Sequence, residues 1–134
     1  MKEERVTLEQ FAEPAASITA EGLKKMTYQY ASQPAEVEYW TDEFICGYPG
    51  QDLPARGSLY VRYVPSAYLL ELDSLRLYLL QYSNVTMLHE HIVTRVLGDL
   101  VKICRPVSMT VEGEFVPRDG LGIRAKAHYL QPRR

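Results

Sequence analysis

The chain has 134 residues, a formal net charge of −2 at neutral pH and 24% charged residues, which are ordinary values for a one-domain globular protein. No apolar run reaches the length of a membrane span, the charged N-terminus lacks a signal-peptide pattern, and no excess of positive charge indicates a nucleic-acid partner. Cys46, Cys104 and the three histidines have neither metal-ligand spacing nor the pattern of a disulfide framework. We therefore expect a cytoplasmic protein with reduced thiols and no metal site.

The first third of the chain predicts an arm, a hairpin and a loop. Residues 1–25 are polar and broken by a proline, so we expect a flexible N-terminal arm, followed by a single domain over residues 26–134. The alternating segments Met26–Tyr30 and Val37–Thr41 predict a β-hairpin. Residues 45–57 contain three glycines and two prolines, which predicts a long loop of the kind that often carries function.

The middle of the chain predicts one strand and two helices. Ser58–Val64 alternates between apolar and polar residues and is a clear strand. Residues 73–82 have helical spacing, but leucines lie on more than one side, so this helix needs a further cover such as another subunit. A single apolar stripe runs from His89 to Cys104 and predicts a second helix that Pro106 ends.

Two more alternating segments, 109–115 and 121–129, predict strands joined by a turn at residues 117–120. The class is therefore α+β, with an antiparallel four-stranded sheet and two helices on one face. Such a sheet has two open edges. Joining several sheets edge to edge into a barrel would close the edges and cover the leucine-rich helix, so we expect a homo-oligomer.

Four phrases in a fixed order resemble a known family. They are Leu59–Pro65, Glu71–Tyr78, His89-Glu90 and Val111–Gly120. Over residues 41–130 they resemble the QueF family of NADPH-dependent 7-cyano-7-deazaguanine reductases of queuosine biosynthesis. The resemblance implies the tunnelling fold (T-fold), in which subunits of this element order assemble into oligomeric barrels.

In that family a loop cysteine attacks the nitrile carbon to form a thioimide, an aspartate seven residues later donates a proton, and NADPH delivers hydride twice. An ungapped alignment places Tyr48 at the cysteine position and Ala55 at the aspartate position. Neither residue can do this chemistry. The motif also carries a lysine where this chain has Asp73, whereas Arg76 and Arg118 keep positive charge at two positions associated with the cofactor.

Two nearby residues could replace the missing groups if the loop shifts its register. Cys46 is the candidate nucleophile and Asp52 the candidate acid, against a packing role for the thiol and a turn-capping role for the carboxylate.

The binding half of the family site is better matched. Glu90 can accept two hydrogen bonds from a guanine-like base, or it can simply be a first-turn carboxylate favoured by the helix dipole. His89 can orient the base or cap the helix. The resemblance further implies that the backbone of Leu70, Glu71 and Leu72 contacts the base.

Three functions are consistent with these features. The first is a relative that binds a 7-deazaguanine- or pterin-like heterocycle and has lost or altered the nitrile reduction, with no cofactor. The second is an active, NADPH-dependent reductase that uses Cys46. The third is an amidinotransferase-like relative that modifies nitrile-bearing tRNA, although that branch also depends on the loop cysteine.

Overall fold

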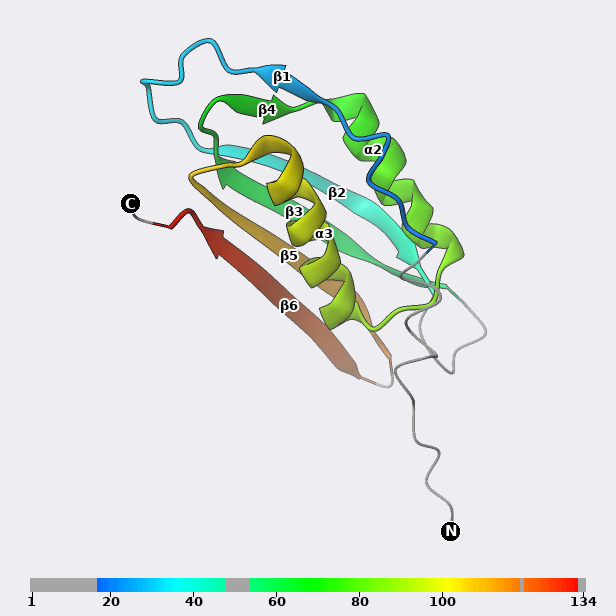
Figure 1. Cartoon of the computed structure of the whole chain (residues 1–134). Helices are drawn as coiled ribbons and strands as arrows, with labels where there is room; N and C mark the ends of the chain where they lie inside the picture. Colours follow the sequence, from blue (N-terminus) through cyan, green and yellow to red (C-terminus); the bar gives the residue numbers. More distant parts are fainter. Residues whose placement is uncertain (1–16, 48–53, 119, 133–134) are drawn as a thin grey trace.

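The computed structural model describes residues 17–47, 54–118 and 120–132, and Figure 1 shows the arrangement of their helices and strands. The strands are β1 Lys25–Thr27, β2 Val37–Cys46, β3 Ala55–Val64, β4 Tyr68–Leu70, β5 Ser108–Arg118 and β6 Leu121–Leu130. The helices are α2 Leu72–Leu80, the 3₁₀ helix η1 Gln81–Asn84 and α3 His89–Cys104.

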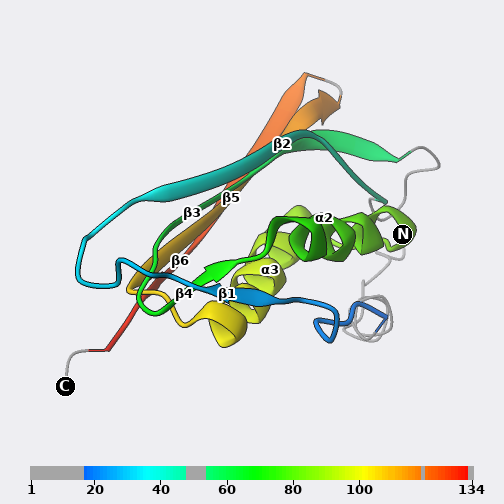
Figure 2. The ribbon, with the colours of Figure 1, turned by 90° about the horizontal axis from the view of Figure 1, so that it is seen from above.

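The strands form two antiparallel sheets. The larger sheet has the order β2-β3-β5-β6, and the smaller one pairs β1 with β4. Figure 2 shows α2 and α3 on one face of the larger sheet, so this α+β architecture is the expected one. Along β3, Leu59, Val61 and Tyr63 are buried under the helices while the alternate residues are half-buried on the other face.

The first hairpin expected from the sequence is wrong. β1 pairs with β4, with Met26 opposite Leu69, and does not pair with β2. β2 is also longer than expected and continues to Cys46, because its end pairs with the first residues of β3. Ile45 and Cys46 therefore belong to the sheet rather than to a loop.

The two helices begin and end close to their predicted limits. The Glu71 carboxylate caps α2 by accepting hydrogen bonds from the backbone N–H groups of Asp73 (2.7 Å) and Ser74 (2.9 Å). α3 ends at Cys104; the capping residue Arg105 has a left-handed φ of 45°, and the buried Pro106 follows. No helix within the described ranges is long and apolar enough to cross a membrane.

Residues 17–25 differ from the expected flexible arm. Ile18 and Leu23 are only 3% and 7% exposed and belong to the hydrophobic core. Residues 1–16 lie outside the described residues. The described part of the chain therefore packs as one unit from residue 17 onward, and not from residue 26.

The open face of the larger sheet carries a network of charges. Arg62 donates hydrogen bonds to Glu38 (3.0 Å) and Glu112 (2.7 Å), and Arg124 pairs with Glu114 (2.9 Å). These cross-strand pairs run from β2 to β6, the two strands at the edges of the sheet. Arg62 lowers the pKa of the Glu112 carboxyl, mainly through their hydrogen bond.

Candidate functional site

The candidate site lies where β2 leaves the larger sheet and α3 begins. Gly47 directly follows β2, donates a backbone hydrogen bond to the Val85 carbonyl (2.9 Å) and pairs with Thr86. A Cβ at this glycine would lie 2.6 Å from Thr86 Oγ1 and 3.0 Å from the Val85 carbonyl oxygen, so a larger residue would push Gly47 away from the 85–86 segment. This contact places the start of the loop beside the segment that leads into His89 and Glu90.

Cys46 is sealed inside this end of the molecule. Its side chain has no solvent exposure, and its Cα lies opposite that of Ala55 in the β2–β3 ladder. Burial raises the pKa of the Cys46 thiol to about 11, so the thiolate is scarce at neutral pH. Such a thiol is a poor nucleophile.

The other candidate catalytic positions are only partly described. Ala55 begins β3 and is 8% exposed. Tyr48 and Asp52 lie outside the described residues. Arg118 ends β5 opposite Leu121, and its side chain is likewise not described.

His89 packs into the core at the start of α3. Its ring stacks on Phe115 with 3.6 Å between the ring centroids and a 10° angle between the planes. Gly113 makes room for this phenyl ring, because a Cβ there would lie 2.7 Å from Phe115 Cε2. The residue before the helix, Leu88, occupies the N-cap position without a side-chain hydrogen bond, so His89 is not the cap.

Glu90 is the exposed carboxylate of the same helical turn. It stands at the positive end of the helix dipole, and its backbone carbonyl accepts a hydrogen bond from the Thr94 hydroxyl (2.9 Å). The exposed Glu90 directly follows the buried His89, whose ring stacks on Phe115. This end of α3 can therefore present a charged acceptor to a planar molecule.

The backbone of Leu70 and Glu71 is already hydrogen-bonded within the chain. Leu70 N–H donates to the Tyr63 hydroxyl (3.0 Å), and the Leu70 carbonyl accepts from the Tyr39 hydroxyl (3.2 Å). Glu71 N–H donates to the Lys24 carbonyl (3.0 Å). The Glu71 carboxylate caps α2, and its pKa is lowered by the hydrogen bonds from Asp73 and Ser74.

The structure does not bring Glu71 and Glu90 together in one chain. Figure 1 shows α2 and α3 running in opposite directions, with Glu71 at the β4 end of the helical layer and Glu90 at the other end. The nine residues of α2 alone span about 13 Å. The two carboxylates therefore lie at opposite ends of the helical layer.

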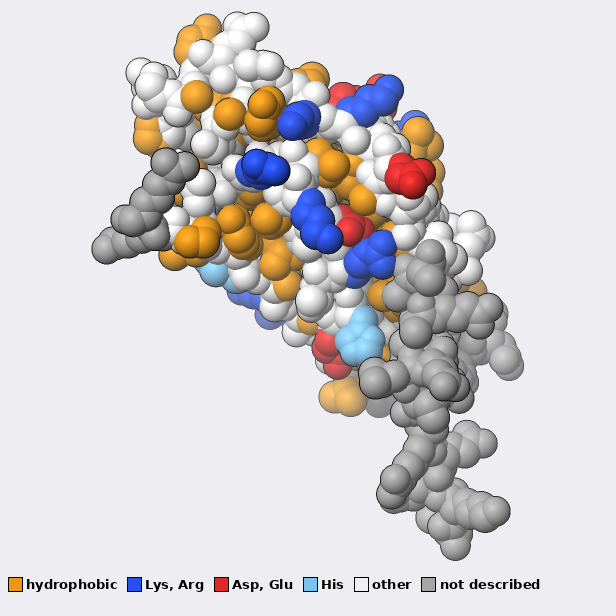
Figure 3. All heavy atoms as spheres, in the orientation of Figure 1, with side chains coloured by type: hydrophobic (Ala, Val, Ile, Leu, Met, Phe, Trp, Pro, Cys, Tyr) orange, Lys and Arg blue, Asp and Glu red, His pale blue; other side chains and the backbone are white. Residues whose placement is uncertain are grey.

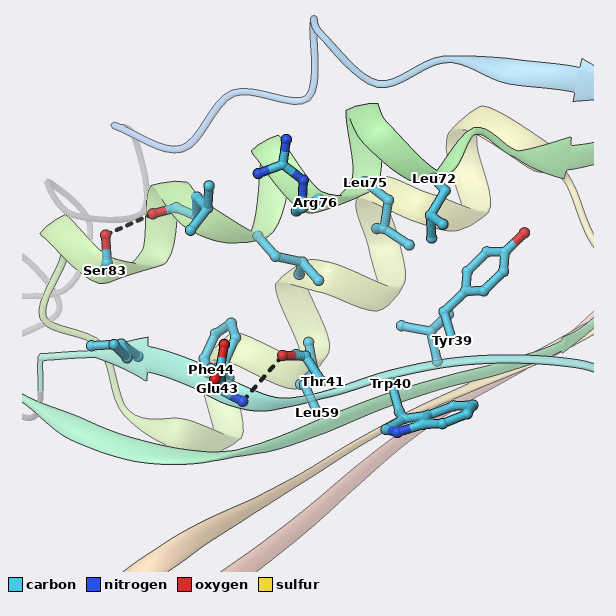
Figure 4. A pocket seen from close by; sticks show the side chains of 14 residues that line it. Tyr39, Trp40, Thr41, Glu43, Phe44, Leu59, Leu72, Leu75, Arg76 and Ser83 are labelled. Atoms are coloured by element: carbon cyan, nitrogen blue, oxygen red, sulfur yellow. Dashed lines mark hydrogen bonds between the residues drawn. The ribbon is translucent and has the colours of Figure 1, made fainter.

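A groove of about 350 Å³ runs between β2 and α2. Figure 4 shows Leu72 and Leu75 pointing from α2 toward β2, with Tyr39 and Thr41 facing them. The guanidinium of Arg76 lies on the outer side of α2, away from β2. Trp40 lies on the opposite face of the strand.

Figure 3 shows the helical face of the molecule, where Lys and Arg side chains gather across the middle between hydrophobic patches. The exposed basic residues of the N-terminal segment, α2 and the end of α3 are Lys24, Lys25, Arg76, Lys102 and Arg105. Asp73 stands three residues before Arg76 on α2, where the two side chains are neighbours on the helix surface. The arginine therefore has an acidic neighbour at the position where the family motif has a lysine.

Sequence reasoning missed the partner of His89. Phe115 lies 26 positions away along the chain, and only the pairing of β3 with β5 and the packing of α3 bring it under the imidazole. The signal available was the spacing of Gly113 and Phe115, in which a residue without a side chain precedes an aromatic one on the same strand face. Within the described ranges, His, Cys, Asp and Glu form no cluster of three that could hold a metal ion.

Comparisons with known proteins point to one family. The family model described as QueF-like protein matches residues 54–134. An NADPH-dependent 7-cyano-7-deazaguanine reductase of Thermoanaerobacter pseudethanolicus is 42% identical over 84% of each chain. The protein of the same name from Caldicellulosiruptor bescii is 43% identical over 84% of this chain and 86% of its own.

A solved structure shows the same fold. The archaeosine synthase QueF-Like in its apo form superposes with a TM-score of 0.68, covering 75% of this chain and 99% of that one, at 17% sequence identity. This likeness supports the chain fold alone. The family model and the reductase relatives together establish that the chain belongs to the QueF family.

Proposed function

We propose that this protein binds a 7-deazaguanine- or pterin-like heterocycle in the cytoplasm and has lost the nitrile reduction for which its relatives are named. The observation that carries the proposal is the composition of the catalytic positions. Tyr48 and Ala55 occupy the aligned places of the nucleophile and the acid, and the nearest thiol, Cys46, is fully buried.

Nitrile reduction by a covalent route needs a thiolate and a proton donor. The thiolate must reach the nitrile carbon, and the nitrogen must be protonated as the thioimide forms. Ala55 has no titratable group, and the raised pKa of Cys46 disfavours its thiolate. The described residues therefore supply neither function.

The binding half of the site supports retention of a ligand. Glu90 is exposed at the beginning of α3, where it can accept hydrogen bonds from the ring N–H and exocyclic amine of a guanine-like base. The His89–Phe115 stack supports the turn that carries it. A pterin presents the same pair of donors.

The residues on α2 do not fit the phosphates of NADPH well. Asp73 places a negative charge next to Arg76. This carboxylate would repel a phosphate, because both groups are negatively charged. The Arg76 side chain lines the groove, but its guanidinium lies on the outer side of α2. We therefore expect the protein to work without NADPH.

The alternative function is an active NADPH-dependent reductase that uses Cys46 and Asp52. The 42% and 43% identity to two proteins named as reductases favours it. It would require Cys46 to leave the core and lose its pairing with Ala55. The second alternative is an amidinotransferase-like function, which has the same need for a loop cysteine.

We expect the protein to act as a homo-oligomer, with sheets joined into a T-fold barrel. The edge strands β2 and β6 are each ten residues long, and their open faces carry opposite charge: Glu38 and Asp42 on β2, Arg124 and Lys126 on β6. Antiparallel pairing of these edges would continue the sheet and cover the groove beside β2. A second chain would also allow Glu71 and Glu90 of different copies to line one site.

Reversal of the β6 charges tests this assembly. Arg124→Glu with Lys126→Glu is expected to shift the sedimentation profile toward monomers, because both new carboxylates would face acidic residues of the neighbouring β2. The control is Lys24→Glu with Lys25→Glu, which changes the net charge equally on the helical side. If both double variants sediment like the parent protein, edge pairing through these charges is wrong.

Intact-mass spectrometry with 7-cyano-7-deazaguanine tests the function itself. The expected result is saturable binding in calorimetry, no covalent adduct and no NADPH consumption. An adduct that disappears in Cys46→Ala, together with NADPH consumption, would favour the reductase alternative over the proposal. Absence of binding to both 7-cyano-7-deazaguanine and a pterin would contradict the proposal.

A further inference from the structure

The described N-terminal segment, residues 17–27, crosses the helices on the side opposite the larger sheet. Figure 2 shows it below α2 and α3, with the sheet above them, and Figure 1 shows it running along the length of α2. It lies outside the region matched by the family model, which begins at residue 54. We call residues 17–27 the N-terminal strap.

The strap is anchored at one end to the C-terminal side of α2 and to α3. The Gln81 side chain makes two hydrogen bonds to the backbone of Thr19: its oxygen accepts from the N–H (2.9 Å) and its amide donates to the carbonyl (2.8 Å). Arg95 of α3 donates to the Ile18 carbonyl (2.8 Å). The buried Ile18 side chain fixes this end in the core.

The other end of the strap is anchored at the beginning of α2. Lys24 N–H donates to the Ser74 hydroxyl (3.0 Å), and the Lys24 carbonyl accepts from Glu71 N–H (3.0 Å). β1 then continues along β4, which leads directly into Glu71. The strap therefore contacts both ends of the helix whose first residues form the Glu71 turn.

The sheet side of α2 is less constrained. The groove of about 350 Å³ separates much of α2 from β2, and the leucines at positions 72 and 80 on its rim are more than half exposed. Leu75 alone reaches nearly full burial among the groove-lining leucines of α2. Within the described ranges, hydrogen bonds join α2 to the strap at Ser74 and to α3 at Tyr78.

We propose that the N-terminal strap is a positioning device: it sets the place of α2, and through it the conformation of the Glu71 turn and the width of the groove. The two anchors act as one unit because the intervening chain is short and Leu23 between them is buried. Removal of the hydrogen bonds at Gln81 should therefore change the conformation of the Glu71 turn, at the opposite end of the helix. This inference is independent of which ligand the protein binds.

The test is Gln81→Ala, which removes both hydrogen bonds to Thr19. The matched control is Ser83→Ala, whose hydroxyl bonds only to the Leu80 carbonyl of its own helical segment. Hydrogen–deuterium exchange followed by mass spectrometry is expected to show about 5- to 10-fold faster exchange in peptides covering residues 68–75 of Gln81→Ala. Peptides covering residues 108–115 should keep the exchange rates of the parent protein, as should all peptides of the control.

Spin labels across the groove give the second readout. Nitroxides at Glu43→Cys and Arg76→Cys, diluted with unlabelled chain, report the separation of β2 and α2, since both native cysteines are buried. Gln81→Ala should lengthen or broaden the distance distribution. Faster exchange confined to residues 17–24, or an unchanged distance distribution, would overturn the proposal. Neither readout involves a ligand, so the proposed function can fail without affecting this result.

Discussion

Replacing Asp99 by alanine is expected to lower the free energy of unfolding by about 3 kcal/mol, because it leaves a buried hydroxyl and a partly buried guanidinium without their shared acceptor. Asp99 lies on the buried side of α3, and its Oδ2 accepts hydrogen bonds from Arg95 Nε (2.8 Å) and the Tyr78 hydroxyl (2.5 Å). Tyr78 in turn lies 2.8 Å from the Tyr82 hydroxyl. The network thus joins α2, η1 and α3.

The electrostatics of this network explain the size of the effect. Burial raises the pKa of Tyr78, and the neighbouring Tyr82 and the hydrogen bond to Asp99 raise it further, so the phenol remains a donor. Without the carboxylate, the buried hydroxyl and the partly buried guanidinium both lose a charged partner. Arg95 also holds the Ile18 carbonyl of the strap, so the loss extends to the N-terminal segment.

Urea unfolding at a fixed protein concentration measures this change. Asp99→Asn is the control: its side-chain oxygen can still accept from Tyr78, and the expected loss is about 1–2 kcal/mol because the charge is removed and the second oxygen is replaced by an NH2 donor. A loss below about 1 kcal/mol in Asp99→Ala would mean that the network contributes little to holding the helices together.

The sequence located the regular elements wherever periodicity was strong. The alternation of Ser58–Val64 and the stripe of His89–Cys104 gave a strand and a helix with nearly the right limits. The three-residue strand β4 was missed because so short a segment has no period to detect. The strand predicted at Met26–Tyr30 overlaps β1 only at Met26 and Thr27, and its partner was wrong because tertiary pairing with β4 decided it.

Isolated apolar residues in a polar segment also escaped prediction. Ile18 and Leu23 look unremarkable in a sequence of charged and small residues, yet both are core residues because they fit against helices formed 50 or more positions later. Glu71 posed a related difficulty. Caps are usually Ser, Thr, Asp or Asn, so a Glu before a helix is a weak signal for a cap, yet the Glu71 side chain caps α2.

For the candidate site, the sequence identified the charged group but not its surroundings. The pair His89-Glu90 was placed correctly at the start of a helix. The two residues of the pair have different environments: the His89 imidazole is buried against Phe115, and the Glu90 carboxylate is exposed. This difference depends on contacts between segments that are distant in the sequence. Because Glu90 is the exposed member of the pair, we expect ligand affinity to depend most on it.

Substitution of Glu90 by glutamine is expected to weaken binding of 7-cyano-7-deazaguanine by about 10- to 100-fold, since a hydrogen bond to a charged group contributes about 1.5–3 kcal/mol. Glutamine keeps the size of the side chain and one acceptor oxygen but removes the charge and replaces the second acceptor by a donor. Glu90→Ala should lose more, because both acceptors disappear. The same order is expected with a pterin, which offers the same donors.

Isothermal titration calorimetry measures these affinities, and the exposure of Glu90 keeps the effect on folding small, at most about 1 kcal/mol from the helix dipole. Glu36→Gln is the control, because this exposed carboxylate precedes β2 and lies outside the proposed site. It should bind like the parent protein. If Glu90→Gln and Glu36→Gln bind with equal affinity, the carboxylate at the start of α3 does not recognise the base, and the ligand must be held from another part of the chain or by a neighbouring copy.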